Sequence, residues 1–463
     1  IARVQLGVLS VLAATGVPAP WLEALDGGSD DARGALSELI ESSVCRLSED
    51  RSKVMIHGLQ GRVIREAWKT EPASWGRIEE EAAGILGAVD VTAIPVSDSA
   101  GRRREALDLV EQLRATAGQD HSRSLFSHPR TADALAHALW HAAELGDPQT
   151  ALSLSGAADL LDEALGPDHP DTLAARNSLA HAYRSAGRLD QAIDLHKRNL
   201  ADCERVLGPD HPHTLTSRNN LAHAYQSAGR LDQAIPLFER SLDDREHILG
   251  SDHPDTLTSR NNLAHAYRSA GRLGQAIDLH ERSLDDREHI LGPDHPHTLT
   301  SRNDLAHAYQ SAGRLKEAVP LFERNLAEAL RILGSDHPYT LTFRNNFAFA
   351  YWSAGSLDEA VPLFEQILAD RERVLGPDHP DILASRGNLA DAYWSAGRLD
   401  QAIDLYEQNL AEALRVLGPD HSHTRLFRGN LAAAYRAVGR DEDAAALLDP
   451  PSDPDDTDAE TPT

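Results

Sequence analysis

The chain has 463 residues and a formal net charge of -27 at pH 7. A negative field of this size argues against non-specific binding to nucleic acid or to an anionic membrane, because both need a positive protein surface. Cys45 and Cys203 are the two cysteines, which excludes a disulfide framework and a four-cysteine zinc site and favours a reducing compartment such as the cytoplasm.

The amino terminus gives no targeting signal that can be interpreted. The apolar stretch Leu6–Val17 contains Gly7 and Ser10 and is too short to span a bilayer. The chain begins with Ile1, so we expect a fragment whose true start lies upstream. Arginine far outnumbers lysine, a bias of GC-rich genomes that points to a bacterial source.

Residues 1–90 are predicted to form a small α+β domain. Apolar residues at helical spacing over 4–12 and 35–40 are followed by two short segments, 44–47 and 54–57, that we expect to pair as a β-hairpin. Another helix is expected over 58–68.

This order resembles the winged-helix domain that ends the nucleotide-binding module of STAND or NB-ARC signal-transduction ATPases. The phrase Met-Ile-His-Gly at 55–58, followed by Arg62 and Arg65, carries the resemblance. It implies that His57 contacts a bound nucleotide when the NTPase domain is present. The chain contains no Gly-x-x-x-x-Gly-Lys-[Ser/Thr] loop, so we expect no cofactor in this fragment, and ADP or ATP only in a longer protein.

Residues 91–165 are predicted to be a helical connector that ends in a degenerate capping repeat. From there a Gly-[Pro/Ser]-Asp-His step recurs every 42 residues, and residues 209–250 and 251–292 agree at 36 of 42 positions. A period of this length indicates stacked supersecondary units. The sequence therefore predicts seven repeats over 166–449, the last one short, followed by an acidic tail over 450–463 with the composition of a disordered segment.

One repeat is predicted to be a helical hairpin. Apolar residues within 209–250 indicate a first helix over about 213–228. Gly229 is expected to close it in a left-handed conformation, and Asp232 to cap a second helix that runs to about Leu249. One hairpin cannot cover its own apolar face, so the hairpins must stack into an all-α array.

Five positions within the unit, Leu221, Ala222, Tyr225, Ala234 and Phe238, fall at the spacings of the tetratricopeptide repeat (TPR). The 42-residue period, with Leu-Gly-Pro-Asp-His-Pro and Arg-Asn-Asn-Leu-Ala, resembles the longer variety found in kinesin light chains and many bacterial regulators. The resemblance covers about 166–449. It implies a right-handed superhelix, a TPR solenoid, whose first helices line a concave groove that binds peptides or proteins.

A polar stripe on the first helices is the candidate groove. Each asparagine amide offers a donor and an acceptor to the backbone of an extended peptide, and the related family uses asparagines in this way. The alternative is that the amides bond to neighbouring helices or to water. The candidate asparagines are Asn177, Asn219, Asn220, Asn261, Asn262, Asn303, Asn345, Asn346 and Asn388.

A row of histidines, His181, His223, His265 and His307, runs beside the asparagines. They lie on separate helices without an added carboxylate or cysteine signature, so we expect no metal. We expect solvated groove histidines, whose protonation near pH 6.5 would weaken the binding of basic peptides.

Aromatic residues replace this polar row in the later repeats. Phe349, Trp352 and Trp394 are predicted to anchor the partner, because aromatic anchors contribute much of the energy of an interface. The alternative is that these rings only repack the array between diverged repeats.

An arginine occupies one position of every repeat, and we expect its guanidinium to meet a carboxylate of a second helix. The Asp-His steps are interpreted as turn-forming residues. The arginines are Arg176, Arg218, Arg260, Arg302, Arg344, Arg386 and Arg428.

These patterns predict a non-enzymatic scaffold that binds a peptide or protein and forms the sensor or regulatory arm of a STAND-type ATPase switch, with oligomerisation on activation. No catalytic residue is expected, because no nucleophile, acid–base or metal constellation stands apart from the repeats. The alternative is a DNA-binding transcriptional regulator with a TPR partner-binding arm, since residues 46–69 carry a small basic excess.

Overall fold

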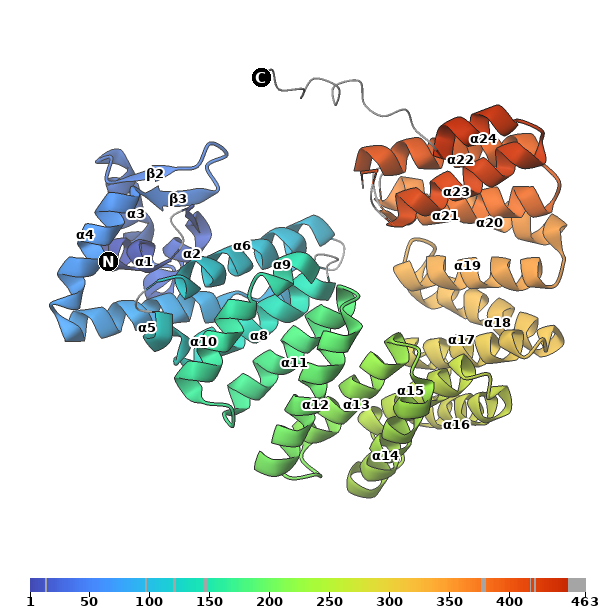
Figure 1. The fold of residues 1–463 in the computed structure, drawn as a ribbon, viewed down its shortest axis with the longest axis horizontal. Helices are drawn as coiled ribbons and strands as arrows, with labels where there is room; N and C mark the ends of the chain where they lie inside the picture. Colours follow the sequence, from blue (N-terminus) through green and yellow to red (C-terminus); the bar gives the residue numbers. More distant parts are fainter. Residues whose placement is uncertain are drawn as a thin grey trace, which may run out of the picture. The chain divides into compact units, whose positions relative to one another are not determined.

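The computed structural model describes residues 1–12, 15–95, 98–119, 122–144, 148–375, 380–416, 418–419 and 422–448. The acidic tail predicted over 450–463 lies outside these residues. The chain divides into two compact units, Ile1–Ser259 and Arg260–Thr463, and Figure 1 traces the elements of each in sequence colours. None of the helices in the described ranges is long and apolar enough to cross a membrane.

The first unit begins with a small sheet among helices. Three antiparallel strands lie in the order β1-β3-β2, with Val17 opposite Val54 and Cys45 opposite Ile56. The hairpin and the helix after it are confirmed, whereas β1 was missed because two residues give no periodic signal. The elements are α1 (Ala2–Val11), β1 (Val17–Pro18), α2 (Ala19–Glu23), a 3-10 turn (Leu25–Gly27), α3 (Asp30–Glu41), β2 (Cys45–Leu47), β3 (Lys53–Ile56), α4 (Gly58–Lys69) and α5 (Pro72–Ala88).

A set of irregular helices joins this sheet region to the repeats. Helix α8 packs against α5, α6 and α11, and one cluster of buried side chains continues from Val8 in α1 through Leu139 in α8 to Leu179 in α11. The sheet region and the first repeat therefore share a core. The connecting elements are a 3-10 turn (Val91–Ala93), α6 (Ser99–Ala117), α7 (Ser122–Phe126), α8 (Pro129–Glu144), α9 (Pro148–Leu152) and α10 (Ser155–Leu165).

The other described helices form hairpins, in which neighbouring helices pack against each other from α11 to α14 in the first unit and from α16 to α24 in the second. In the first unit these are α11 (Pro170–Ser185), α12 (Leu189–Val206), α13 (Pro212–Ser227) and α14 (Leu231–Leu249). Helix α15 (Pro254–Ser269) contains the boundary between the units. The second unit continues with α16 (Leu273–Leu291), α17 (Pro296–Ser311), α18 (Leu315–Leu333), α19 (Pro338–Ser353), α20 (Leu357–Leu375), α21 (Pro380–Ser395), α22 (Leu399–Val416), α23 (Ser422–Ala437) and α24 (Asp441–Leu448).

Small residues let the two helices of a hairpin approach closely. Ala222 and Ala234 are fully buried, and Phe238 fills the space beyond them. Gly229 adopts φ 71° and ends α13 as predicted. The prediction that Asp232 caps α14 is wrong, because α14 begins one residue earlier at Leu231. Asp232 instead lies in the first turn, where its charge favours the helix dipole.

In five of the repeats a histidine caps the first helix. In every case the ring Nδ1 accepts a hydrogen bond from the backbone N–H two residues further on, at 3.1–3.3 Å. This bond satisfies one of the backbone donors that a helix start leaves without a partner. The capping histidines are His169, His211, His253, His295 and His337.

Replacing His211 by alanine should lower the free energy of unfolding by about 1 kcal/mol, the usual cost of losing a side-chain cap. His211→Asn keeps an acceptor at the same place and should lose only a few tenths of that. Urea unfolding at pH 8 measures both. Equal losses in the two variants would mean that the histidine contributes by packing and not as a cap.

Candidate functional site

The asparagines of successive first helices hydrogen-bond to one another. Asn220 Nδ2 donates to Asn177 Oδ1 at 2.9 Å. In the second unit Asn346 Nδ2 donates to Asn303 Oδ1 at 2.9 Å, and Asn388 Nδ2 donates to Asn345 Oδ1 at 3.4 Å. The donor always lies 43 residues after the acceptor, so the bonds form a ladder, which we call the asparagine ladder.

The asparagine ladder uses only part of the hydrogen-bonding capacity of each amide. Asn177, Asn303 and Asn345 accept through Oδ1, and their own side-chain N–H groups have no partner among the described residues. An asparagine amide has two N–H donors. The amides therefore bond to neighbouring helices, as the alternative stated. Asn303 is 8% exposed, whereas Asn177 and Asn345 are half-buried and still carry donors that another chain could use.

The ladder changes at the start of the second unit. Asn261 Nδ2 lies 3.1 Å from His265 Nε2 on its own helix, and Asp304 stands where the other repeats have the donor asparagine. Asp304 Oδ2 is 3.7 Å from the same His265 nitrogen. Asn219 and Asn262 are half-buried, and each has an interaction of its own.

His181 is not a solvated side chain. It is 4% exposed, its ring stacks on Trp140 with centroids 4.0 Å apart, and its Nε2 lies 2.7 Å from Glu144 Oε1. Arg184 Nη2 donates to His181 Nδ1 at 2.9 Å, and burial followed by Arg184 lowers the pKa of His181. The expectation of a solvated groove histidine is therefore wrong here, because α8 covers the ring.

The other three histidines of the row are half-buried against their own hairpin. The rings of His223 and His307 meet Phe238 and Phe322 edge-on, with centroids 4.9 and 5.0 Å apart. His265 meets His280 in the same way at 5.2 Å. These three histidines therefore pack the first helix of each hairpin against its second helix. In the described part of the chain, no group of three or more His, Cys, Asp or Glu side chains could hold a metal ion.

The aromatic residues of the later repeats form a half-buried cluster. Phe349 lies 5.5 Å from Trp352 and 5.1 Å from the buried ring of Phe364, between centroids. Trp352 Nε1 donates to Ser395 Oγ on α21 at 3.1 Å. Trp394 is also half-buried. These rings pack between repeats and also leave part of their surface open, so both interpretations retain support.

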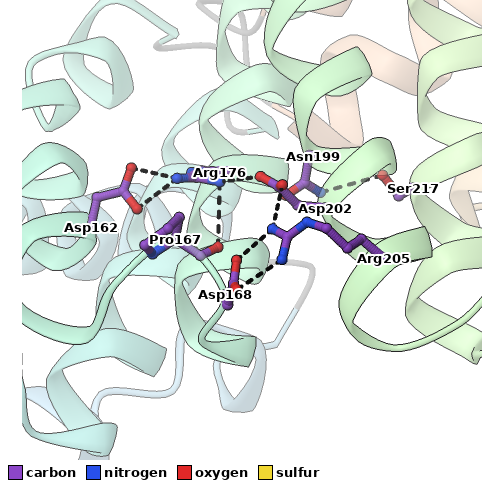
Figure 2. A network of polar contacts seen from close by, with 8 residues as sticks. All are labelled: Asp162, Pro167, Asp168, Arg176, Asn199, Asp202, Arg205 and Ser217. Carbon is purple, nitrogen blue, oxygen red and sulfur yellow. Dashed lines mark hydrogen bonds and ion pairs between the residues drawn. The ribbon is translucent and has the colours of Figure 1, made fainter.

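Several of the repeated arginines join consecutive hairpins, as Figure 2 shows for Arg176. Its guanidinium bonds to both carboxylate oxygens of Asp162 at 2.6 Å and to Asp202 Oδ2 at 2.8 Å. Arg302 likewise bonds to Glu288 at 2.7 Å and to Glu328. Glu288 lies 14 residues before Arg302, on the second helix of the preceding hairpin. Glu328 lies 26 residues after Arg302, on the second helix of the same hairpin.

Members of this arginine row are among the most deeply buried charged groups of the chain. Arg218 and Arg302 are 1% and 0% exposed, which confirms that the stem packs and the guanidinium meets second-helix carboxylates. The other contacts of the row are Arg218 with Glu204 and Asp244, Arg260 with Asp286, Arg344 with Asp370, and Arg386 with Glu372.

In the amino-terminal region, His57 is exposed and caps α4, with Nδ1 accepting from the Leu59 N–H at 3.3 Å. Arg65 donates to the backbone carbonyl of Ser10 and so ties α4 to the end of α1. Arg62 is exposed. The structure thus gives His57 and Arg65 structural roles.

The stacked hairpins define an α-helical repeat protein. The model of the tetratricopeptide repeat family matches residues 171–247, 218–289, 255–327, 303–373, 339–411 and 395–449, which together span more than half of the chain. The chain therefore belongs to the tetratricopeptide repeat family. No curated protein matches it.

Several solved structures are similar in fold. A putative kinesin light chain of Podosopora anserina with nearly identical TPR-like repeats is 32% identical, with 45% of this chain and 99% of that chain covered and a TM-score of 0.42. A STAND protein with a tetratricopeptide repeat sensor from Pyrococcus horikoshii is 14% identical, with 92% and 65% covered and a TM-score of 0.43. A Rap protein complexed with competence and sporulation factor is 11% identical, with 68% and 95% covered and a TM-score of 0.42.

Proposed function

We propose that the chain binds an extended peptide, or an unfolded segment of a protein partner, along the first-helix face within a unit, beside Asn177 in the first unit or beside Asn303 and Asn345 in the second. The observation that carries this proposal is the set of N–H groups left over on Asn177, Asn303 and Asn345. Packed helices lie about 8–10 Å apart and an extended chain advances about 3.3 Å per residue, so one amide can meet every third peptide carbonyl. The negative charge of the chain favours neutral or basic partners.

Peptides selected from a random-sequence display on the full-length chain test this proposal. Asn303→Asp and Asn345→Asp keep the oxygen that accepts from the next repeat and remove the unpartnered N–H donor. Each lost bond is worth about 1 kcal/mol, so the double variant should bind the selected peptides at least tenfold more weakly. Calorimetric titration measures the affinity, and the melting temperature is followed beside it because a carboxylate at Asn303, which is 8% exposed, lowers stability.

Gln408→Ala, at an exposed position of the second helix α22, is the matched control and should bind normally. Equal affinity of the double aspartate variant and the original chain would contradict the proposal. A selection that yields no peptide at all would contradict it as well.

We also propose that the array is the regulatory arm of a STAND-type switch whose NTPase domain lies elsewhere in a longer protein. The element order α1, β1, α2, α3, β2, β3, with the antiparallel sheet order β1-β3-β2, resembles that of a winged helix and supports this proposal. The core shared by α1, α8 and α11 offers a physical connection between the repeats and that region. A phosphate-binding loop in the upstream coding sequence would support the proposal, and its absence would leave a free-standing scaffold.

DNA binding is less well supported. In a helix-turn-helix arrangement the second of the paired helices enters the major groove, and α3 would be that helix here. It carries Asp30, Asp31, Glu38 and Glu41 against Arg33. A helix of this charge is repelled by phosphates.

A further inference from the structure

A pocket of about 300 Å³ opens where α8, α11, α12 and α13 meet. Its lining residues range from exposed at the mouth to buried at the floor. The mouth includes Asp133 and Thr216, Trp140 forms a wall, and the floor is formed by Asn199, Cys203 and Ser217. We call it the Cys203 pocket.

The Cys203 pocket exists because two small residues face each other across a junction between repeats. In every other described pair at these two positions, 14 residues apart, a large side chain meets a small one. Those pairs are Leu161 with Ala175, Arg245 with Ser259, Arg287 with Ser301, Ala329 with Phe343, Arg371 with Ser385, and Ala413 with Phe427. Cys203 and Ser217 are both small, so no side chain of the described residues fills the space.

The neighbouring repeats show which side chain suits such a space. Arg371 Nη1 donates to Ser385 Oγ at 2.6 Å, and Arg245 and Arg287 make the same bond to the serines that face them. Arg287 is 8% exposed and has no carboxylate in contact among the described residues. The junction therefore accepts a buried guanidinium that donates to a serine hydroxyl.

The floor of the Cys203 pocket keeps the acceptors and lacks the arginine. Asn199 is 2% exposed, and Figure 2 shows its Nδ2 donating to Ser217 Oγ at 3.3 Å. Its Oδ1 is buried and has no partner in the ranges that the structure describes. A buried carbonyl without a donor costs about 1–3 kcal/mol, so a ligand that brings an N–H group to it gains affinity.

We propose that the Cys203 pocket takes the arginine side chain of a bound peptide, with the guanidinium donating to Asn199 Oδ1 and Ser217 Oγ. Asp133 at the mouth supplies negative charge, and Trp140, whose ring stacks on His181, lines the pocket beside the cation. This inference rests on the proposed function, because Asn177 belongs both to the pocket lining and to the asparagine ladder. The partner would be a basic peptide that the chain recognises through one arginine side chain.

The smallest probe of this pocket is N-acetyl-arginine amide, titrated into the full-length chain while the indole N–H signal of Trp140 is followed by NMR. Trp140→Phe identifies that signal. The arginine probe should shift it, and the citrulline, lysine and leucine analogues should bind at least tenfold more weakly. Citrulline has nearly the same shape without the charge, so it isolates the guanidinium.

Cys203→Arg refills the space in the way that the chain already does at Arg245. This variant should melt no lower than the original and lose at least tenfold in affinity for the arginine probe. Cys203→Ser leaves the space open and should bind normally. If Cys203→Arg does not fold, Ser217→Phe fills the pocket from the opposite side, as Phe343 does beside Ala329, and the same loss is expected.

Unchanged probe affinity in a folded Cys203→Arg or Ser217→Phe variant would overturn the inference, and so would equal binding of the leucine or citrulline analogue. The test of the arginine pocket and the test of the peptide-binding face can give different results. Peptides that lack arginine, still bind, and still depend on Asn303 would remove the arginine pocket and leave the peptide-binding face intact.

Discussion

Acidification from pH 7 to pH 5 is expected to destabilise the folded chain by about 2 kcal/mol for each of two buried histidines. His196 and His280 are 1% and 0% exposed. Burial is the main cause that lowers the pKa of His196 to about 3, with Arg184 adding to it. Burial likewise lowers the pKa of His280 to about 4, with His265 adding to it.

The direction follows from the protons that each state binds. An unfolded histidine titrates near 6.5, above both folded values, so the unfolded chain binds more protons between about pH 6.5 and pH 4. The stability is fully present above the unfolded pKa and is lost as the pH falls toward the folded one. One pH unit in this window costs about 1.4 kcal/mol for each histidine.

Urea unfolding at pH 7, 6 and 5 measures this dependence, and the chain offers its own control. Phe238, Phe322 and Phe364 occupy the same repeat position as His196 and His280. The double variant His196→Phe, His280→Phe should therefore fold, and its stability should change by about 4 kcal/mol less across this range than that of the original chain. An unaltered pH dependence in the double variant would show that other groups cause it.

Arg302→Ala is expected to lower the free energy of unfolding by about 3 kcal/mol, the lower end of the range for breaking a buried ion pair. The guanidinium of Arg302 is buried and joins Glu288 on the preceding second helix to Glu328 on its own hairpin. Its loss leaves a cavity and two carboxylates without their cation. The lower end applies because Glu288 is 34% exposed and can regain water.

Arg324 supplies the matched control for this substitution. It also bonds to Glu328, at 2.9 Å, but its side chain is 55% exposed. Exposed pairs contribute about 0–1 kcal/mol, so Arg324→Ala should have a small effect in the same urea titration. If the two substitutions cost the same, burial of the arginine row does not set its contribution to stability.

The regular part of the fold was predictable because its sequence period is so strict. The expected first helix over 213–228 is found at Pro212–Ser227, and the second ends at Leu249 as predicted. The predictions failed where the sequence pattern is too short or too local to define an element and its first residue. Strand β1 is too short to show a period, and Asp232, which was expected to cap the second helix, lies inside a helix that begins at Leu231.

The candidate site was less predictable, because its contacts join residues on different hairpins. The asparagines were found as single rows, but their bonds link positions 43 residues apart and depend on how the hairpins stack. The burial of His181 depends on α8, which lies outside the repeat register. The Cys203 pocket did leave a trace in the sequence, visible only when two repeat positions are compared together.

The constant spacing of the arginine contacts bears on how the array can change in length. Because Arg302 takes one acceptor 14 residues before it and one 26 residues after it, excision of residues 251–292 would present Glu246 to Arg302 in place of Glu288. Unequal recombination between gene segments could thus remove this whole unit while Arg302 keeps a carboxylate on each side. Cys203 lies outside the excised residues, so proteins with longer or shorter arrays could share the same ligand pocket.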